Sequence, residues 1–207
     1  MKPVYISFVD LSINKDKGEQ NDSIKASWKR ILIKETAYPN PEIRTNSNGK
    51  PLIIYPEGWY YNISHSSGIA VSILGNIPVG IDIEKVSLKR DTKSLAEEYF
   101  RPEEIKYCCK SQKHFYCLWT RKEAWIKLQG STVWQMRNTP DMSTATENIH
   151  TWQISDGETD YYLSAALDIP EKDKEIRIIW SGIENLSLSP QDSSLKIGMD
   201  EQSSVIK

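Results

Sequence analysis

The stretch "VGIDIEKV", residues Val79–Val86, alternates apolar and polar side chains in the way that is typical of a β-strand. Successive side chains of a strand point to opposite faces, so we expect Ile81 and Ile83 to pack on a core and Asp82 and Glu84 to share the other face. Their Cα atoms would then lie roughly 6.5 to 7 Å apart. Two carboxylates at that spacing repel each other, and partial burial strengthens the repulsion. The pattern therefore predicts either an exposed edge strand with solvated acids or a carboxylate pair that holds a divalent cation such as Mg²⁺.

The composition around this stretch is that of an ordinary globular protein. The chain has 207 residues, 39% of them hydrophobic and 26% charged, which is enough for one large domain or two small, closely packed ones. A net charge of −2 gives no reason to expect binding to nucleic acid or to a membrane. The three cysteines lack a C-x-x-C spacing, so neither a disulfide framework nor a zinc site is predicted. Free thiols and the lack of a signal-peptide pattern lead us to expect a cytoplasmic protein.

The character of the chain changes from strands to helices and back to strands. Residues 22–37 are expected to form a helix that is capped by Asp22 or Ser23. The residues from 191 to 207 are polar and aperiodic, which predicts a loose tail. Together the pattern predicts an α+β fold. Further helices are expected at 91–100, 102–108 and 113–130, and strands at 4–10, 59–64, 69–75, 78–84, 149–154, 160–167 and 175–180.

The segment "FYCLWTRKEAWIKLQG", residues 115–130, is predicted to be an amphipathic helix. Glu123 and Lys127 are four residues apart and lie together on its flank, where an ordinary surface ion pair is one interpretation. Lys122 falls inside the apolar arc of the helix. A lysine in that place must extend to solvent or meet an anion, which a bound ligand would supply.

Two turn-rich segments carry further polar residues. "YYNISHSSG" contains Ser64 and His65 between two expected strands, and "NSNGKP" places Lys50 directly after an Asn-Gly turn. Each is compatible with an ordinary surface position when it is taken alone.

Taken together, four blocks of the sequence resemble the 4′-phosphopantetheinyl transferase superfamily, specifically its long, surfactin-synthetase-activating type. They are "NSNGKPLI", "YNISHSSGIAVSIL", "VGIDIEKV", and "YFRPEEI" followed by "FYCLWTRKEAWIKLQG", in the order of the family. They cover about Asn46 to Gly130, and the pair G-x-D-x-E with W-T-x-K-E-A-x-x-K is highly specific. After Gly130 the chain departs from the family, with "STVW" where a Lys-Gly pair is common.

The resemblance implies a Mg²⁺-dependent enzyme that moves the phosphopantetheine arm of coenzyme A to a serine of an apo acyl, peptidyl or aryl carrier protein, with release of adenosine 3′,5′-bisphosphate. Such carriers serve nonribosomal peptide, polyketide or fatty-acid synthesis. The implied metal ligands are Asp82, Glu84 and Glu123. Glu123, directly or through a water molecule, would be the base, and Lys127 would stabilise the leaving group. The implied catalytic residues are thus Asp82, Glu123 and Lys127.

The resemblance also implies a binding site for coenzyme A. The phosphate and nucleotide contacts would come from Lys50, Ser64, His65, Lys122 and Lys127. The basic helix near the N-terminus would help to hold the 3′-phosphate, with candidates Lys25, Lys29, Arg30 and Lys34.

The implied architecture is a monomer with two similar halves related by a pseudo-twofold axis. Residues 1–76 would contact the nucleotide, residues 77–190 would carry the acids and the catalytic helix, and residues 191–207 would be a flexible tail. Two other interpretations stay open: a Mg²⁺-dependent phosphohydrolase, and a non-catalytic module that binds coenzyme A or a carrier protein.

Overall fold

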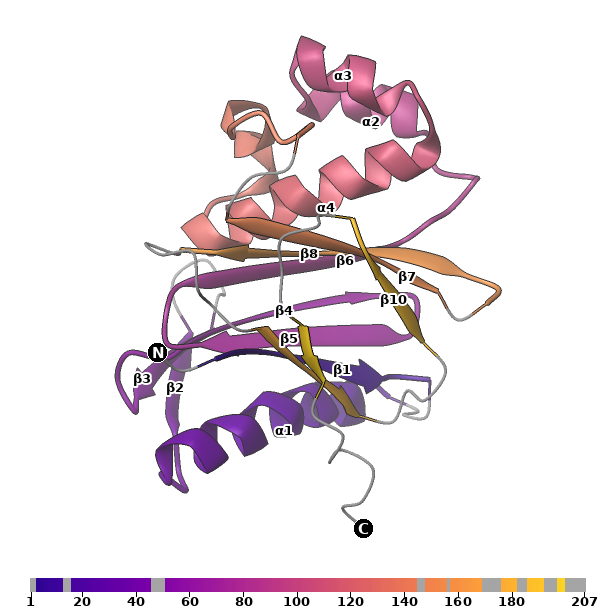
Figure 1. The fold of residues 1–207 in the computed structure, drawn as a ribbon. Helices are drawn as coiled ribbons and strands as arrows, with labels where there is room; N and C mark the ends of the chain where they lie inside the picture. The colour runs from indigo at the N-terminus through magenta and orange to yellow at the C-terminus, as the bar shows by residue number, and fades with distance from the viewer. Residues whose placement is uncertain are drawn as a thin grey trace.

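Two β-sheets pack face to face in the computed structural model of the chain, and one long helix covers the outer face of each (Figure 1). The structure describes residues 3–12, 16–45, 51–144, 148–155, 157–168, 176–181, 186–191 and 197–199. This arrangement of helices and mostly antiparallel sheets confirms the predicted α+β class. Within the described residues, no helix combines the length and the apolar character that a membrane span requires.

The first sheet contains strands from both the N-terminal and the C-terminal parts of the sequence. Its five strands lie in the order β11-β9-β1-β5-β4. β1 is antiparallel to β5 and parallel to β9, and β9 is parallel to β11. A boundary after residue 76 therefore does not separate the two sheets. Residues 197–199, which belong to the expected tail, form β11. The bounds are β1 Val4–Asp10, β4 Tyr60–Ser66, β5 Ile69–Gly75, β9 Ile176–Ser181 and β11 Ile197–Met199.

The second sheet has four strands in the order β10-β7-β8-β6, so β6 lies at its edge. β4 lies at the edge of the first sheet, and the two edge strands are joined through side chains. Asn62 Oδ1 accepts a hydrogen bond from Ile81 N at 3.1 Å, and Ser66 Oγ accepts one from Lys85 N at 3.0 Å. The strands of this sheet are β6 Val79–Lys85, β7 Ile149–Ser155, β8 Asp160–Leu167 and β10 Ser187–Pro190.

The long helix α1, Lys17–Thr36, begins earlier than the apolar spacing predicts. Its cap is Asp16, whose side chain accepts a hydrogen bond from Glu19 N at 2.9 Å, rather than Asp22 or Ser23. The remaining helices cover the second sheet or connect to it. They are α2 Thr92–Tyr99, α3 Pro102–Cys108, α4 Gln112–Gln129 and the 3₁₀ helix η1 Val133–Asn138, and a separate ribbon is formed by β2 Glu42–Thr45 and β3 Pro51–Tyr55.

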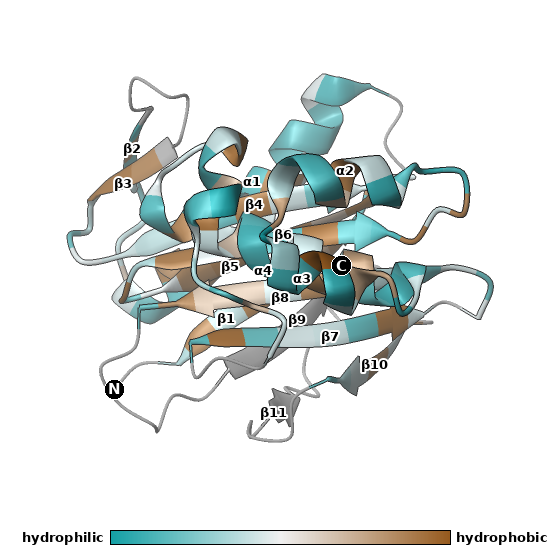
Figure 2. Cartoon of the chain, turned by 90° about the horizontal axis from the view of Figure 1, so that it is seen from above, coloured by the Kyte–Doolittle hydropathy of each residue, from teal (hydrophilic) through white to brown (hydrophobic). Residues whose placement is uncertain are grey.

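One core lies between the sheets, where apolar side chains of β1 and β5 meet those of β6, β7 and β8. Ile81 and Ile83 belong to this core, as the alternation in "VGIDIEKV" predicts. A second core lies under α4 and contains Phe115 and Trp119. Figure 2 shows hydrophilic positions concentrated in the helices α1, α2 and α4, while hydrophobic positions recur along the strands. The opposite face of β6, which carries the two acids, is consequently turned toward α4.

Candidate functional site

The contact between β6 and α4 depends on a glycine in "VGIDIEKV". A Cβ atom on Gly80 would lie 2.0 Å from the backbone oxygen of Ala124 and 2.5 Å from the backbone nitrogen of Leu128. Only a residue without a side chain lets the helix approach the strand this closely. The following polar residues of β6 therefore lie directly beside the second half of α4.

Asp82 is the centre of a polar cluster built from three elements. Its side chain belongs to β6 and is 6% exposed, while Ser64 comes from β4 and Lys127 from α4. Lys127 Nζ donates to Asp82 Oδ1 at 2.7 Å, and Ser64 Oγ donates to the same oxygen at 2.8 Å. Lys127 Nζ also donates to Ser64 Oγ at 3.0 Å. The structure thus brings together three of the residues that the sequence singles out.

The other carboxylate oxygen of Asp82 is left unpaired. Within the described part of the chain, Oδ2 is buried and has no hydrogen-bond partner. A buried acceptor of this kind costs about 1–3 kcal/mol unless a donor or a cation reaches it. The oxygen is therefore a ligand position that a bound group could use.

Glu84 lies on the same face of β6, farther along the strand. Its Oε2 is 3.4 Å from Nη1 of Arg90, and Ser66 Oγ lies 3.5 Å from the same oxygen. Burial raises the pKa of Glu84, the negative charge of Asp82 raises it further, and Arg90 opposes both effects. Arg90, in the loop between β6 and α2, was not anticipated from the sequence.

Glu123 is half-buried on α4 and responds to the charges of the same cluster. Burial raises its pKa to about 7, the negative charge of Asp82 adds to the rise, and Lys127 opposes it. The charge of Glu84 raises the pKa further, so the three carboxylates are electrostatically coupled. A carboxyl group that titrates near neutral pH is suited to accept a proton from a substrate.

The chemistry of these donors fits a hard divalent cation, although their rotamers do not form a closed shell. Within the described residues, no group of three or more His, Cys, Asp or Glu side chains is gathered so that it could hold a metal ion. Lys127 and Arg90 instead pair with Asp82 and Glu84. Two features fit a cation: the unpaired Oδ2 of Asp82 and the mutual repulsion of the three carboxylates. Rotation of the Glu84 and Glu123 side chains would bring their carboxylates to the same cation. The ligand set Asp82, Glu84 and Glu123 stays a prediction.

Lys122 requires a correction. Its side chain is fully buried, and Nζ donates to both carboxylate oxygens of Glu104 at 2.8 and 2.7 Å. Glu104 also accepts from the backbone nitrogens of Arg101 and Met142, at 3.0 and 3.1 Å. The anion that meets Lys122 is therefore supplied by α3 and not by a ligand. Burial lowers the pKa of the Lys122 ammonium group, and the contact with Glu104 opposes this change.

The remaining predicted contacts with coenzyme A lie elsewhere or outside the described residues. Lys50 is outside the described residues. His65 is exposed, and the alternation along β4 turns it to the face opposite Ser64. That face also carries Tyr61, which stacks on Trp28 of α1 with ring centroids 4.1 Å apart. The basic residues of α1 are on this side of the first sheet, with Lys25, Arg30 and Lys34 exposed and Lys29 half-buried.

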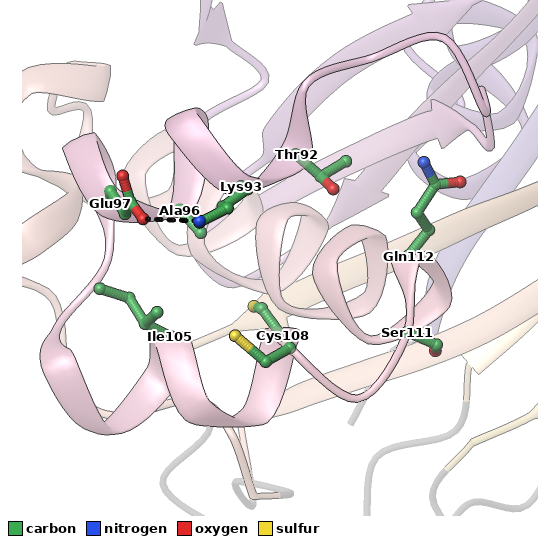
Figure 3. Close-up of a pocket in the computed structure, with 9 residues that line it drawn as sticks. Thr92, Lys93, Ala96, Glu97, Ile105, Cys108, Ser111 and Gln112 are labelled. Atoms are coloured by element: carbon green, nitrogen blue, oxygen red, sulfur yellow. Dashed lines mark ion pairs between the residues drawn. The ribbon is translucent and has the colours of Figure 1, made fainter.

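A cavity of about 310 Å³ lies between α2, α3 and the start of α4 (Figure 3). Lys93 and Glu97 at its rim form an ion pair at 4.0 Å. Burial raises the pKa of the Cys108 thiol in its wall to about 12, so this thiol is a poor nucleophile. None of the acidic residues of β6 or α4 lines the cavity, and it is separate from the Asp82 cluster.

Comparison with known proteins identifies relatives of the region that holds this cluster. Residues 78–178 match the sequence model of the 4′-phosphopantetheinyl transferase superfamily. The chain is 32% identical over 112 residues to the 4′-phosphopantetheinyl transferase psf-1 of Bacillus pumilus, a match that covers 51% of this chain and 47% of the relative. It is 32% identical over 126 residues to the 4′-phosphopantetheinyl transferase AcpT of Salmonella typhi, covering 54% of this chain and 62% of the relative.

A third relative is the 4′-phosphopantetheinyl transferase gsp of Aneurinibacillus migulanus, which is 37% identical over 113 residues, or 51% of this chain and 46% of the relative. The chain thus spans about half of psf-1 and gsp and about three fifths of AcpT. The region that matches the superfamily contains Asp82, Glu84, Glu123 and Lys127, whereas Ser64 precedes it.

Proposed function

The chain belongs to the 4′-phosphopantetheinyl transferase superfamily, and on this premise we propose that it transfers the 4′-phosphopantetheine arm of coenzyme A to a serine of an apo carrier protein. The observation that carries the proposal is the convergence of β6, β4 and α4 on Asp82, with Lys127 Nζ and Ser64 Oγ on one carboxylate oxygen and Glu123 beside them. Paired positive and negative groups of this kind suit the transfer of a phosphate-linked group.

In the proposed reaction, the carrier serine oxygen forms a bond to the β-phosphorus of coenzyme A. The bond from that phosphorus to the bridging oxygen breaks, and adenosine 3′,5′-bisphosphate leaves with the electron pair. Glu123 takes the serine proton, directly or through a water molecule. Lys127, held at 2.7 Å from Asp82, stabilises the negative charge that develops on the leaving group.

We propose that Mg²⁺ is held by Asp82, Glu84 and Glu123, and when bound it would neutralise the diphosphate and orient it. The unpaired Oδ2 of Asp82 supports this assignment, because it is a buried hard-oxygen donor that lacks a partner within the described residues. Lys127 then remains as the cation that faces the phosphates from α4. Lys122 has no part in this contact, because Glu104 encloses its ammonium group.

The nucleotide end of coenzyme A is assigned to the other side of β4. His65 and the basic residues of α1 share that side, and a 3′-phosphate is the anion that they would hold. Lys50 belongs to the same proposal through its place in "NSNGKP". Ser64, on the opposite face of the strand, would contact the diphosphate instead.

We also propose that the chain is a monomer whose two sheet-and-helix units are related by a pseudo-twofold axis. Each unit has one long helix on the outer face of its sheet, which supports this interpretation. The acids of β6 and the polar side chains of β4 would then lie at the contact between the units. Any of the acyl, peptidyl or aryl carriers would meet the same site.

One experiment separates the proposed transfer from the two alternatives. The protein is incubated with coenzyme A, Mg²⁺ and an apo acyl carrier protein, and the carrier is weighed by intact-protein mass spectrometry while the small products are separated by chromatography. The proposal expects a carrier that has gained the phosphopantetheine arm and an equal amount of adenosine 3′,5′-bisphosphate. Inorganic phosphate with an unmodified carrier would indicate a phosphohydrolase, and bound coenzyme A without either product would indicate a binding module.

A further inference from the structure

Arg90 brings a fixed positive charge to the acidic face of β6. It lies in the loop between β6 and α2, and its Nη1 is 3.4 Å from Oε2 of Glu84. The side chains of both partners are largely buried, with 28% of Arg90 and 26% of Glu84 exposed. This pair is therefore shielded from solvent more than an ordinary surface ion pair.

Aromatic side chains of α4 hold the guanidinium group in this place. Its Cζ is 4.8 Å from the ring centroid of Trp119, 5.8 Å from that of Tyr116 and 5.9 Å from that of Phe115. A guanidinium group over aromatic faces is attracted by their negative ring potential. The loop itself is tied to the same helix, because the hydroxyl of Tyr116 accepts from Ser87 N at 3.1 Å and lies 3.3 Å from Ser87 O.

Among the described residues, Arg90 is one of two positive charges that balance the three carboxylates of the site. Asp82, Glu84 and Glu123 influence one another, and the positive charges that oppose their repulsion belong to Lys127 and Arg90. Arg90 lies against one of the two oxygens of Glu84, the carboxylate that the proposal assigns to the divalent cation. A cation and a guanidinium group so close to one carboxylate also repel each other.

We propose that Arg90 is a built-in competitor of the divalent cation at the acidic site, and that binding of the cation draws Glu84 away from Arg90. Arg90 is thus a positioning residue that sets the cation affinity through Glu84. The inference rests on the proposed function, because it takes the metal-binding role of Glu84 from it. The rings of Phe115, Tyr116 and Trp119 keep Arg90 in place while Glu84 turns to the cation. Glu84 can therefore pair with Arg90 again when the cation leaves.

The test measures binding of Mn²⁺ alone to the full chain by electron paramagnetic resonance, without coenzyme A or carrier. Arg90→Gln removes the competing charge and is expected to bind Mn²⁺ about 3- to 10-fold more tightly than the wild type. Lys89→Gln is the matched control, because it removes one positive charge from the neighbouring exposed residue, and it is expected to leave the affinity unchanged. Arg90→Met, which keeps a long stem over the aromatic rings, is a second neutral variant.

Several outcomes overturn the inference. The first is that Arg90→Gln and Arg90→Met bind Mn²⁺ no more tightly than the wild type. The second is that Lys89→Gln binds Mn²⁺ as much more tightly as the Arg90 variants do. The third is that none of these proteins binds Mn²⁺. The transfer assay is scored separately. Transfer with no change in Mn²⁺ affinity refutes only the role of Arg90, whereas tighter Mn²⁺ binding without transfer refutes only the proposed function.

Discussion

Replacing Gly80 with alanine adds one methyl group at the point where β6 touches α4. The new Cβ would lie 2.0 Å from Ala124 O and 2.5 Å from Leu128 N, whereas ordinary contacts begin at 3.4 Å. Both atoms belong to the helix backbone, so no side chain can rotate away. The helix must therefore move from the strand by about 1.4 Å, the difference between the ordinary contact and the distance to Ala124 O.

Two effects of this displacement can be measured. Overpacking of a core typically costs about 1–3 kcal/mol, and we expect a loss of about 3 kcal/mol in the free energy of unfolding, because the clash is between backbones. The displacement also separates Lys127 Nζ from Asp82 Oδ1, which are now 2.7 Å apart. A misplacement of about 1 Å in a catalytic site can cost about 100-fold in rate. We therefore expect loading of the carrier to fall by about that factor.

Urea unfolding followed by circular dichroism and carrier loading followed by mass spectrometry test both effects. Gly75→Ala is the control, because its Cβ would meet only side-chain atoms, with Val4 Cγ2 at 3.2 Å and Val79 Cγ1 at 3.4 Å. These methyl groups can adjust, so we expect a loss below about 1 kcal/mol. The reasoning is refuted if Gly80→Ala unfolds within about 0.5 kcal/mol of the wild type and loads the carrier at the wild-type rate.

Two other predictions concern buried charges. Glu104→Gln leaves the Lys122 ammonium group buried without its counter-ion, so the free energy of unfolding in urea titrations should fall by about 3–5 kcal/mol. Adding Lys122→Met should restore part of this loss. A loss below about 1 kcal/mol for Glu104→Gln would contradict the prediction. Burial lowers the pKa of His150 to about 4, below its value of about 6.5 in the unfolded chain. His150 therefore does not change the free energy of unfolding above about pH 6.5. As the pH falls from about 6.5 through 4, the free energy of unfolding is expected to decrease by about 3 kcal/mol, because the unfolded chain takes up this proton first. His150→Phe should remove this part of the pH dependence. The prediction is contradicted if the free energy of unfolding depends on pH in the same way in both proteins.

The elements that build the site could be predicted because each has a strong local pattern. The alternation in "VGIDIEKV" and the helical spacing in "FYCLWTRKEAWIKLQG" led to β6 and α4 with boundaries close to those observed. The start of α1 was predicted too late because its first turn, from Lys17 onward, is polar and carries no apolar periodicity. The strand β11 was not predicted, since its pairing with β9 is a long-range contact without a local signal.

Side-chain partners were harder to predict than elements. The helical pattern correctly indicated that Lys122 points into the core, but it could not name Glu104 as the partner, because α3 contributes that residue through the tertiary fold. Arg90 lies in a loop with no periodic pattern, and only the packing against Trp119 gives it a defined place. Gly80 was visible as part of G-x-D-x-E, yet its reason, the close approach of α4, requires coordinates.

The most direct test of the account is the rate at which Asp82→Asn loads an apo acyl carrier protein, relative to the wild type at saturating coenzyme A and Mg²⁺. The amide oxygen of asparagine can still accept from Ser64 and Lys127, so the variant is expected to fold, as circular dichroism would verify. Loss of the carboxylate charge is expected to lower the rate by about 100-fold or more. A folded Asp82→Asn protein that loads the carrier within about threefold of the wild-type rate would show that the junction of β6, β4 and α4 is not where the transfer occurs.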